Sequence, residues 1–538
     1  MRFSLPLIAR PLAGSGVAVG LFFAVASTAF ATPISSSPIA RTSTGTLVGQ
    51  AVAGEDEFLG IRYAEPPVGT LRWEPPVPAP HSHATQQAIA FGPHCPQGAS
   101  PFGLPSATED CLFLNVYTPP HVRAAFGGLP VMLWYHGGAF VVGESNDYNP
   151  VRLVAKNVIV VTANYRLGAL GFLAHPALDA EKHLFANYGL LDQQAALAWV
   201  RRNAAAFGGD ARRITIFGES AGGASVISQL ASPLAAGMFS KAIIESGAYA
   251  NTPTLPEAEA EGTAFATATG CTSQTSACLR ALPVATILAN EPTGYVPTVD
   301  GTILPLNPKV AFSEGKFSRV PIIDGSNGEE FRLFTSLDFD LVTGPITATT
   351  YPFALDAEVG TTAAPLVEAQ YPLANYPSPD LADAAALTDG TFSCNALFVD
   401  QSLAHYVPTF AYEFADVNAP EVFLPPVAYP YEAAHASEIQ YLFNIPESFP
   451  GTLDAQQQKL AADMVSYWTS FATFGVPFSR TSTPWFPFFT KYSDMISLNT
   501  PRSSLFTTFP TEHQCAFWAA LLASTEPTAH ARQMIRAR

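Results

Sequence analysis

The segment R-I-T-I-F-G-E-S-A-G-G-A-S-V-I-S-Q-L, which begins at Arg213, constrains the fold of this 538-residue chain more than any other segment. Residues 214–217 are β-branched or aromatic and predict a short buried strand, and residues 221–230 predict a helix that opens on small side chains. Ser220 therefore stands at a strand-to-helix corner, where glycines two positions to either side leave room for the chains to cross. This G-x-S-x-G corner is typical of a nucleophilic serine. A glycine-rich turn that happens to contain serine is the alternative, so the assignment requires an oxyanion loop upstream and an acid and a histidine downstream.

Two apolar runs, 129–135 and 158–164, predict strands that are covered on both faces, as in the interior of an α/β sheet. The first run leads directly into His136-Gly137-Gly138-Ala139-Phe140, whose small residues allow backbone N–H groups to turn inward, as an oxyanion hole requires. An ordinary glycine turn is the alternative. A helix is predicted over 190–207, just before the strand that ends at the serine corner. Strand, helix and strand in this order form a parallel crossover unit, so the predicted fold class is α/β.

The formal net charge of −17 disfavours a polyanionic partner such as nucleic acid. Arg2 and Arg10 are followed by an apolar run that ends near Ala31, which predicts a secretory signal peptide over residues 1–31. A membrane anchor is the alternative, but the run is short and broken by glycine and serine, and no later stretch is apolar enough to span a bilayer. We therefore expect a secreted protein, extracellular or periplasmic, cleaved near Ala31.

An even number of cysteines in an exported chain predicts disulfides. Proximity in the sequence suggests three pairs, Cys95 with Cys111, Cys271 with Cys278, and the remaining Cys394 with Cys515. A metal site is the alternative, but no C-x-x-C pair supports one, and the His81-x-His83 pair alone does not make a site. We expect neither a metal nor a cofactor.

Residues from about 250 to 315 and from about 335 to 425 are rich in alanine, proline and threonine and lack long strand patterns. We expect helical and loop insertions there, which form a cap over the catalytic face. Between them, 320–330 predicts a short strand ending in a turn, a position where α/β sheets place functional acids. Among the histidines after this turn, His435 is flanked by small residues that leave the imidazole accessible, whereas His405 lies in a strand-like stretch and is expected to be structural.

With these motifs the chain resembles the type-B carboxylesterase/lipase family of α/β-hydrolases, which includes the cholinesterases. The likeness covers nearly the whole mature chain. Beyond G-E-S-A-G-G, the segments that carry it are G-I-R-Y-A-E-P-P-V-G-T-L-R-W at 60–73, E-D-C-L-F-L-N-V at 109–116, N-Y-R-L-G-A-L-G-F-L at 164–173 and N-Y-G-L-L-D-Q at 187–193. The resemblance implies one α/β-hydrolase catalytic domain over 32–538, with a large, mostly parallel sheet flanked by helices, and the hydrolysis of carboxylic esters.

The resemblance also implies a catalytic triad in the order serine, acid, histidine. The family pattern G-x-N-x-D-E fits Gly325 and Asn327, which places the acid at Glu330 and leaves Glu329 as a surface charge. The pattern G-x-x-H-x-x-E-I-x-x-x-F places the base at His435. The nucleophile is Ser220.

The oxyanion would accept hydrogen bonds from backbone N–H groups of Gly138, Ala139 and Ala221, with Gly137 allowing the turn. Phe331 departs from the family pattern, which has glycine at that position.

The expected partner is a small-molecule ester, and the sequence carries no signal for an oligomeric state. In the cholinesterases of the family this chain resembles, a tryptophan in the first disulfide loop binds the quaternary ammonium, and in its fungal lipases the same loop is a long lid. Residues 96–110 contain no tryptophan and form a short segment, so the resemblance disfavours choline esters and interfacial lipolysis. Side chains expected to line the substrate pocket are Glu219, Phe140, Phe331, Phe334 and Phe102, and ordinary core packing is the alternative for each phenylalanine. A lipase acting on longer acylglycerols and a non-catalytic interaction domain remain as alternatives.

Overall fold

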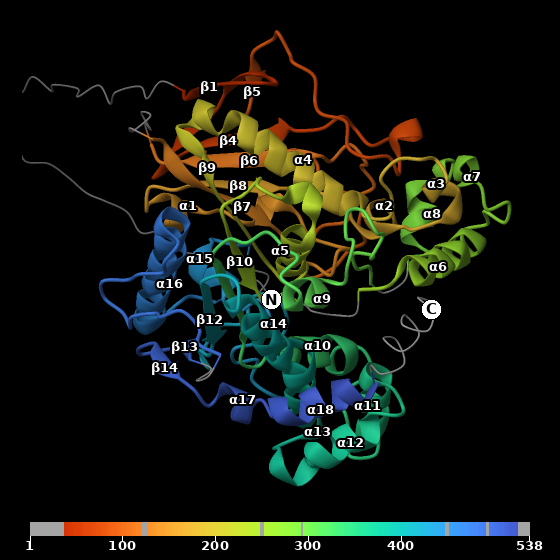
Figure 1. The fold of residues 1–538 in the computed structure, drawn as a ribbon, viewed down its shortest axis with the longest axis vertical. Helices are drawn as coiled ribbons and strands as arrows, with labels where there is room; N and C mark the ends of the chain where they lie inside the picture. Colours follow the sequence, from red (N-terminus) through yellow and green to blue (C-terminus); the bar gives the residue numbers. More distant parts are fainter. Residues whose placement is uncertain are drawn as a thin grey trace, which may run out of the picture. The chain divides into compact units, whose positions relative to one another are not determined.

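A mixed sheet of eleven strands organises the computed structural model, which describes residues 37–120, 127–247, 252–291, 294–446, 451–490 and 494–525 (Figure 1). The expected signal peptide and its cleavage site lie outside the described residues. The spatial order is β14-β13-β12-β11-β10-β9-β7-β8-β6-β4-β3. Its strands along the chain are β3 (Gln50–Val52), β4 (Glu55–Arg62), β6 (Phe113–Thr118), β7 (Leu129–Tyr135), β8 (Ile159–Ala163), β9 (Gly209–Glu219), β10 (Lys241–Glu245), β11 (Ile322–Asn327), β12 (Thr409–Phe414), β13 (Met495–Leu498) and β14 (Ser504–Phe506).

The seven strands from β8 to β13 in this order pair in parallel, and antiparallel pairs occur only toward the two edges of the described sheet. The expected mostly parallel sheet is thereby confirmed. A smaller sheet combines β1 (Ile39–Thr42), β2 (Gly45–Val48) and β5 (Gln86–Gln87).

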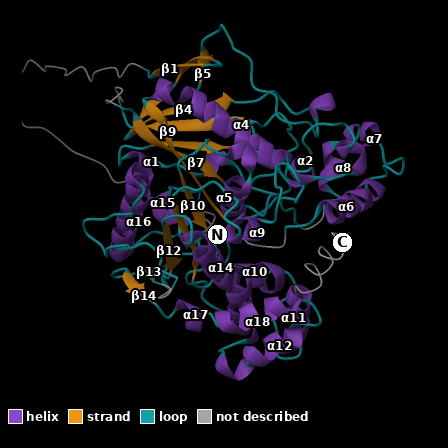
Figure 2. Cartoon of the chain, viewed as in Figure 1, coloured by secondary structure: helices purple, strands orange, loops and turns teal. Residues whose placement is uncertain are grey.

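Helices cover both faces of the large sheet (Figure 2). Those of the described chain are α1 (Val151–Val154), α2 (Gly168–Phe172), α3 (Pro176–Asp179), α4 (Tyr188–Asn203), α5 (Ala221–Ala231), α6 (Leu255–Ala268), α7 (Ser276–Arg280), α8 (Val284–Leu288), α9 (Pro308–Ser313), α10 (Phe331–Thr335), α11 (Tyr351–Val359), α12 (Ala364–Gln370), α13 (Pro379–Leu387), α14 (Cys394–Ala404), α15 (Ile439–Leu442), α16 (Ala455–Phe474), α17 (Phe509–Glu512) and α18 (Cys515–Thr525). None of the helices in these ranges is both long and apolar enough to cross a membrane.

The alternation of side chains along the strands builds two separate cores. In β7, Leu133 and Tyr135 pack with α4, α5 and α14 on one face, whereas Met132 and Trp134 pack with α15 and α16 on the other. Both sets are almost fully buried, which explains why the strand reads as a continuous apolar run rather than an alternating one.

The second cap insertion was expected over about 335–425, but the C-terminal part of this range belongs to the central sheet and its packing. Helices α11, α12 and α13 form an apolar cluster of their own with α18, as a cap would. However, β12 lies inside the range 335–425 and is a strand of the central sheet, and α14 packs on that sheet. His405 follows the last residue of α14 and caps this helix, so it does not lie in a strand.

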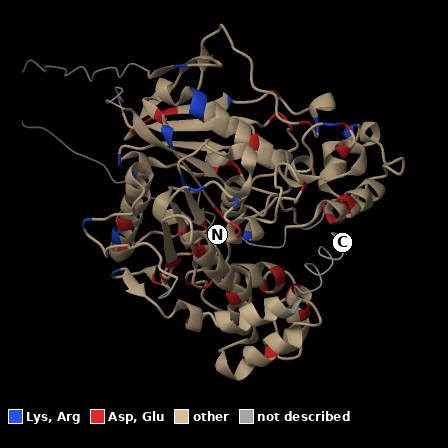
Figure 3. Cartoon of the chain, in the orientation of Figure 1, with Lys and Arg blue, Asp and Glu red and all other residues tan. Residues whose placement is uncertain are grey.

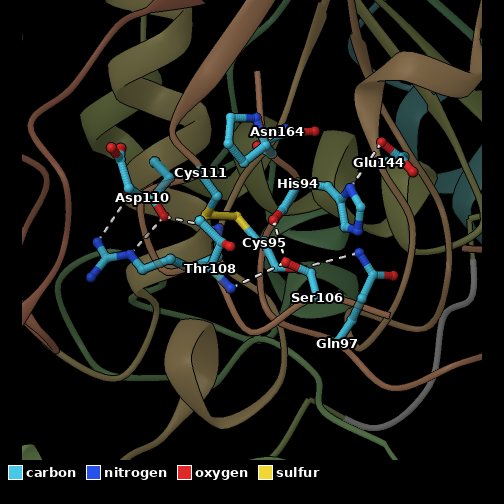
Figure 4. The surroundings of a disulfide bond; sticks show 12 residues. His94, Cys95, Gln97, Ser106, Thr108, Asp110, Cys111, Glu144 and Asn164 are labelled. Carbon is cyan, nitrogen blue, oxygen red and sulfur yellow. Dashed lines mark hydrogen bonds and ion pairs between the residues drawn. A yellow bond between two sulfur atoms is a disulfide. The ribbon is translucent and has the colours of Figure 1, made fainter. Parts of the chain in front are cut away.

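All three predicted disulfides are present, and every described cysteine is paired. Figure 4 shows the surroundings of the Cys95–Cys111 bond. Inside this short loop, the buried side chain of Gln97 accepts from the Gly143 N–H at 2.7 Å and donates to the Gly143 carbonyl at 3.0 Å. Because Gly143 closely follows the 136–140 glycine loop, the disulfide loop is fastened to that loop.

Charged residues are spread over the sheet and the helices of the described chain (Figure 3). A buried set of interacting ionisable side chains lies at the ends of β9, β10 and β11, where His435 meets several carboxylates. These strand ends form the edge at which the motifs singled out in the sequence converge.

Candidate active site

Ser220 joins β9 to α5 in the sharp corner that the sequence predicts. Its backbone has φ 57° and ψ −122°, a conformation that costs a residue with a side chain about 1–3 kcal/mol and that the surrounding structure must enforce. The Ser220 N–H donates to the Glu245 carbonyl at 2.9 Å. A Cβ on Gly222 would lie 1.9 Å from the Tyr135 carbonyl oxygen, so only glycine permits the helix to start this close to β7.

The glycine loop after β7 packs directly against this corner. A Cβ on Gly137 would lie 3.2 Å from Ser220 Cβ and 2.8 Å from Glu219 Oε2. Gly138, Ala139 and Phe140 all have positive φ, at 101°, 53° and 60°. Ala139 and Ala221 line the same cavity as Ser220. The four residues expected at an oxyanion hole are therefore gathered around the serine.

His435 and Glu330 are 105 residues apart in the chain and meet at the end of β11. His435 Nδ1 lies 2.6 Å from Glu330 Oε2, and Glu330 Oε1 accepts from the Asn327 N–H at 2.7 Å. Both side chains are buried. The neighbouring Glu329 instead forms an ion pair with Arg332 at 2.9 Å. Of the two carboxylates, Glu330 is the one that contacts the histidine.

Aromatic rings enclose the imidazole on its cavity side. The ring centroids of Phe334 and Phe392 lie 4.8 Å and 5.1 Å from that of His435. Phe331, which departs from the family pattern, packs against both phenylalanines, and its N–H donates to Thr388 Oγ1 at 3.0 Å. The phenylalanine therefore fits here as the first residue of α10, in a backbone conformation that does not require glycine.

A second carboxylate approaches the other nitrogen of the imidazole. Glu219 Oε1 lies 3.1 Å from His435 Nε2, and Glu219 is 2% exposed. Burial raises the pKa of Glu219 well above its usual range, and the charge of His435 opposes this rise. Burial lowers the pKa of His435, but Glu219, Glu330 and Glu438 together raise it above its usual range. Glu219 is not among the described residues that line the cavity at Ser220, and its carboxylate lies next to Gly137 and the histidine.

Sequence reasoning did not assign roles to two further acids at this edge. Glu438 accepts from Asn327 Nδ2 at 2.6 Å, and burial raises its pKa to about 7. Glu245 accepts from Trp468 Nε1 at 2.9 Å, and burial raises its pKa well above its usual range. Glu438 could have been found, because it stands three residues after His435 in the same motif. Glu245 carries only the signal of an acid at the end of an apolar strand.

A cavity of about 280 Å³ opens at Ser220. Phe140, Phe331, Phe334 and Phe392 line it. Phe102 does not, since it packs against Phe423 at 5.5 Å between ring centroids. Most of the remaining wall comes from α5, the segment 294–297 and α9, with Val399 from α14, and most of it is apolar. The site can therefore take a largely apolar small molecule next to the serine hydroxyl.

A separate group of possible metal ligands, Glu74, Glu181 and His183, comes together near α7. Arg280 already forms ion pairs with both carboxylates, at 3.2 Å and 2.7 Å, so a cation of the protein itself occupies this position. The group is part of the packing between α3, α7 and the segment after β4.

Comparison with known proteins gives one consistent result. The model of the carboxylesterase family matches residues 36–518. The chain is 35% identical to the para-nitrobenzyl esterase of Bacillus subtilis, over 82% of this chain and 90% of that protein. It is 34% identical to the fumonisin B1 esterase of Sphingopyxis macrogoltabida, over 83% and 84%. A solved structure of a PNB esterase covers 89% of this chain and 99% of its own, with a TM-score of 0.75 and 32% identity, and it confirms the α/β-hydrolase fold.

Proposed function

The chain belongs to the carboxylesterase family and is a carboxylic ester hydrolase, and we propose that it is a secreted serine esterase with Ser220 as nucleophile, His435 as base and Glu330 as acid. The observation that carries this proposal is the 2.6 Å contact between His435 Nδ1 and Glu330 Oε2, next to a cavity that opens at Ser220. The order serine, acid, histidine along the chain is the order of α/β-hydrolase triads.

In this mechanism His435 Nε2 takes the proton of Ser220 Oγ, which attacks the ester carbonyl carbon. The tetrahedral intermediate collapses, His435 gives the proton to the leaving alcohol, and an acyl-enzyme remains. Water, deprotonated by His435, then attacks the acyl carbon and forms a second tetrahedral intermediate. This intermediate collapses as the bond to Ser220 Oγ breaks, His435 returns the proton to Ser220 Oγ, and the acid is released. The Glu330 carboxylate accepts a hydrogen bond from His435 Nδ1–H. This bond fixes the tautomer of the imidazole and stabilises the imidazolium that forms during the reaction.

The negative oxygen of both intermediates would lie against the N–H groups of Gly138, Ala139 and Ala221. Backbone donors of this kind are held in place before the reaction, so they need little reorganisation when charge develops. Loss of one donor typically costs about 3 kcal/mol of transition-state stabilisation. The positive φ angles at Gly138 and Ala139 support this assignment, because such backbone conformations occur where a loop turns its amides toward a ligand.

We expect the Glu219→Gln variant to shift the acid limb of the kcat/KM profile to lower pH. The carboxylate of Glu219 favours the protonated imidazole, so its removal lowers the pKa of His435. A base with a lower pKa stays neutral, and therefore active, in more acidic buffer. The measurement is the hydrolysis of 4-nitrophenyl butanoate between about pH 4 and 9.

The matched control for this shift is Glu329→Gln, because the Glu329 carboxylate is close in sequence but forms its ion pair with Arg332. Its acid limb should coincide with that of the wild-type protein. An unchanged limb in Glu219→Gln, or a shift to higher pH, would show that Glu219 does not act on the base as proposed.

The structure favours soluble esters of moderate size over interfacial substrates. The Cys95–Cys111 loop is short, and Gln97 fastens it to the loop that follows the oxyanion residues, so it is not built to move as a lid. The cavity of about 280 Å³ is slightly smaller than the usual range for small-molecule pockets, about 300–1,000 Å³.

Hydrolysis of a series of 4-nitrophenyl esters, from acetate to palmitate, tests the proposed function and its substrate range. We expect kcat/KM to be highest for short and medium acyl chains and to show no jump above the solubility limit of the substrate. A rate that rises sharply once the ester forms an interface would instead indicate a lipase. No hydrolysis of any ester would overturn the proposed function.

Export is part of the proposal. Three disulfides are typical of proteins in an oxidising compartment, and they agree with the signal peptide expected over residues 1–31. The mature protein should then begin near Thr32.

A further inference from the structure

The catalytic cavity extends away from Ser220 along one side of α5. The residues of this helix that line the cavity begin one position after the serine and continue for two turns, and they are Ala221, Ala224, Ile227 and Ser228. At a rise of about 1.5 Å per residue, the last of them lies about 10 Å from the first along the helix axis. The cavity therefore has room for a chain of several atoms beyond the reacting carbonyl group.

A second wall of the cavity also leads away from the catalytic residues. Phe392, whose ring centroid lies 5.1 Å from that of His435, lines the cavity at the catalytic end. The chain then continues into α14, and Val399 on this helix lines the cavity about two turns further along. The two walls therefore extend from the catalytic residues over a similar length.

Helix α9 connects these two walls at their far ends. The Ser313 carbonyl, at the end of α9, accepts from the Tyr406 hydroxyl just beyond α14, at 3.0 Å. The Ser318 N–H, shortly after α9, donates to the Leu230 carbonyl near the end of α5, at 2.8 Å. The C-terminal half of α9, which carries Phe312, therefore lies toward the far end of the cavity.

Among the described residues, three almost fully buried side chains form this far end. They are Ile227, Phe312 and Val399, which are 5%, 0% and 1% exposed. Phe312 also packs against Phe317 at 5.3 Å between ring centroids, and Phe317 packs against Tyr406 at 5.9 Å. Because the interior is closely packed, Phe312 cannot turn aside without displacing these rings, so the end of the cavity is fixed.

The chemistry of the proposed reaction indicates which part of the ester extends into this space. His435 protonates the oxygen of the leaving alcohol, so the alcohol part must lie on the side of the imidazole, next to Phe334. The acyl carbon is bonded to Ser220 in the acyl-enzyme, and α5 begins at the next residue. The acyl chain therefore extends along α5, away from the imidazole.

We propose that Phe312 is a specificity-determining residue that ends an acyl-binding channel and limits straight acyl chains to about eight carbons. The inference rests on the proposed function and names its substrate class, esters of straight-chain acids of medium length. An extended chain advances about 1.3 Å for each C–C bond of about 1.5 Å, so a channel of about 10 Å holds about eight carbons. Each buried methylene favours binding until the terminal methyl group meets Phe312.

The test compares the 4-nitrophenyl esters of butanoate, hexanoate, octanoate, decanoate and dodecanoate, each below its solubility limit. For the wild-type protein we expect kcat/KM to rise up to about octanoate and to fall about tenfold at dodecanoate. Phe312→Val should raise the ratio of kcat/KM for dodecanoate to that for octanoate about tenfold, because the smaller side chain lengthens the channel. An unchanged ratio would overturn the inference.

A substitution nearer to the serine acts in the opposite direction and removes no side chain from the core. Ala224 lies one turn along α5, so leucine at this position should close the channel beyond about four carbons. We expect Ala224→Leu to lower the ratio of kcat/KM for octanoate to that for butanoate about tenfold or more. If this ratio stays at the wild-type value, the acyl chain does not run along α5 and the inference fails.

The matched control for the first variant is Phe471→Val. Phe471 is as fully buried as Phe312, but it packs on the other face of the sheet and is not among the described residues that line the cavity. Its ratios should equal those of the wild-type protein, which separates a change of the channel from a general loss of packing.

A series of acetate esters of butanol, octanol and dodecanol separates acyl from alcohol binding. Phe312→Val should leave the relative kcat/KM values within this series unchanged. If it changes the preference among the alcohols and not among the acyl chains, the channel binds the alcohol and the inference is overturned. Hydrolysis of 4-nitrophenyl butanoate by the wild-type protein would leave the proposed function standing in each of these outcomes.

Discussion

The Ser220→Ala variant should lose about 10⁴-fold or more in kcat/KM for 4-nitrophenyl butanoate, because no other group in the mechanism can form the acyl-enzyme. Alanine keeps the Cβ of the corner residue, so the strained backbone and the packing of α5 stay as they are. The melting temperature should therefore remain close to that of the wild-type protein. Steady-state kinetics and thermal unfolding of the same preparation measure both quantities.

Ser232→Ala is the matched control for this loss. Ser232 caps the other end of α5 and does not line the cavity, so its removal should leave ester hydrolysis in place. If Ser220→Ala keeps more than about a thousandth of the wild-type activity, Ser220 is not the nucleophile.

Removing the Cys394–Cys515 disulfide should cause the largest loss of stability among the three bonds. This bond joins positions 121 residues apart, and it ties the start of α14 to the start of α18. In the chain-entropy model a closed loop of this length stabilises the folded state by about 4–5 kcal/mol, because the unfolded chain loses more freedom when the loop is long. The double variant Cys394→Ser/Cys515→Ser tests this by urea unfolding.

The matched comparison is Cys271→Ser/Cys278→Ser, which opens a loop with a sequence separation of only 7. The same model gives about 2 kcal/mol for so short a loop. If the short-loop variant proves to be the less stable of the two, loop length does not govern the contribution of these bonds.

The central sheet and the serine corner could be predicted because their signals are local. The strand β7 matches the predicted range 129–135 completely, since both faces of this strand are buried and its apolar run has clear ends. The helix predicted over 190–207 corresponds to α4 and the short 3-10 turn that follows it. At the corner, the glycines at 218 and 222 are required by contacts that a Cβ would make impossible.

The strand β12 could not be placed in the same way. Its sequence T-F-A-Y-E-F is short, and it follows the helical, alanine-rich segment that ends with α14. Its membership in the sheet depends on pairing with β11 and β13, which are far away in the chain. Contacts of that kind leave little trace in the local pattern, so the predicted cap extended across the strand.

In the candidate site, too, some features could be predicted from the sequence and others could not. The positions of Ser220, Glu330 and His435 follow from motifs, and the parallel pairing of β9, β10, β11 and β12 brings the segments after these strands to one edge of the sheet. Glu219 faces His435 Nε2 because of the way the chain turns next to Gly137. This turn is a feature of the folded chain and leaves no pattern in the sequence. Phe312 carries no motif at all, and only the structure places it in the cavity wall.

The most direct test of the central claim is the mass of the intact protein after reaction with an organophosphate, followed by peptide mapping. The account predicts a single covalent adduct per chain, located on Ser220, together with complete loss of ester hydrolysis. The Ser220→Ala variant should take up no label. An adduct on another serine, such as the buried Ser246 at the end of β10, or inactivation without an adduct on Ser220, would contradict it.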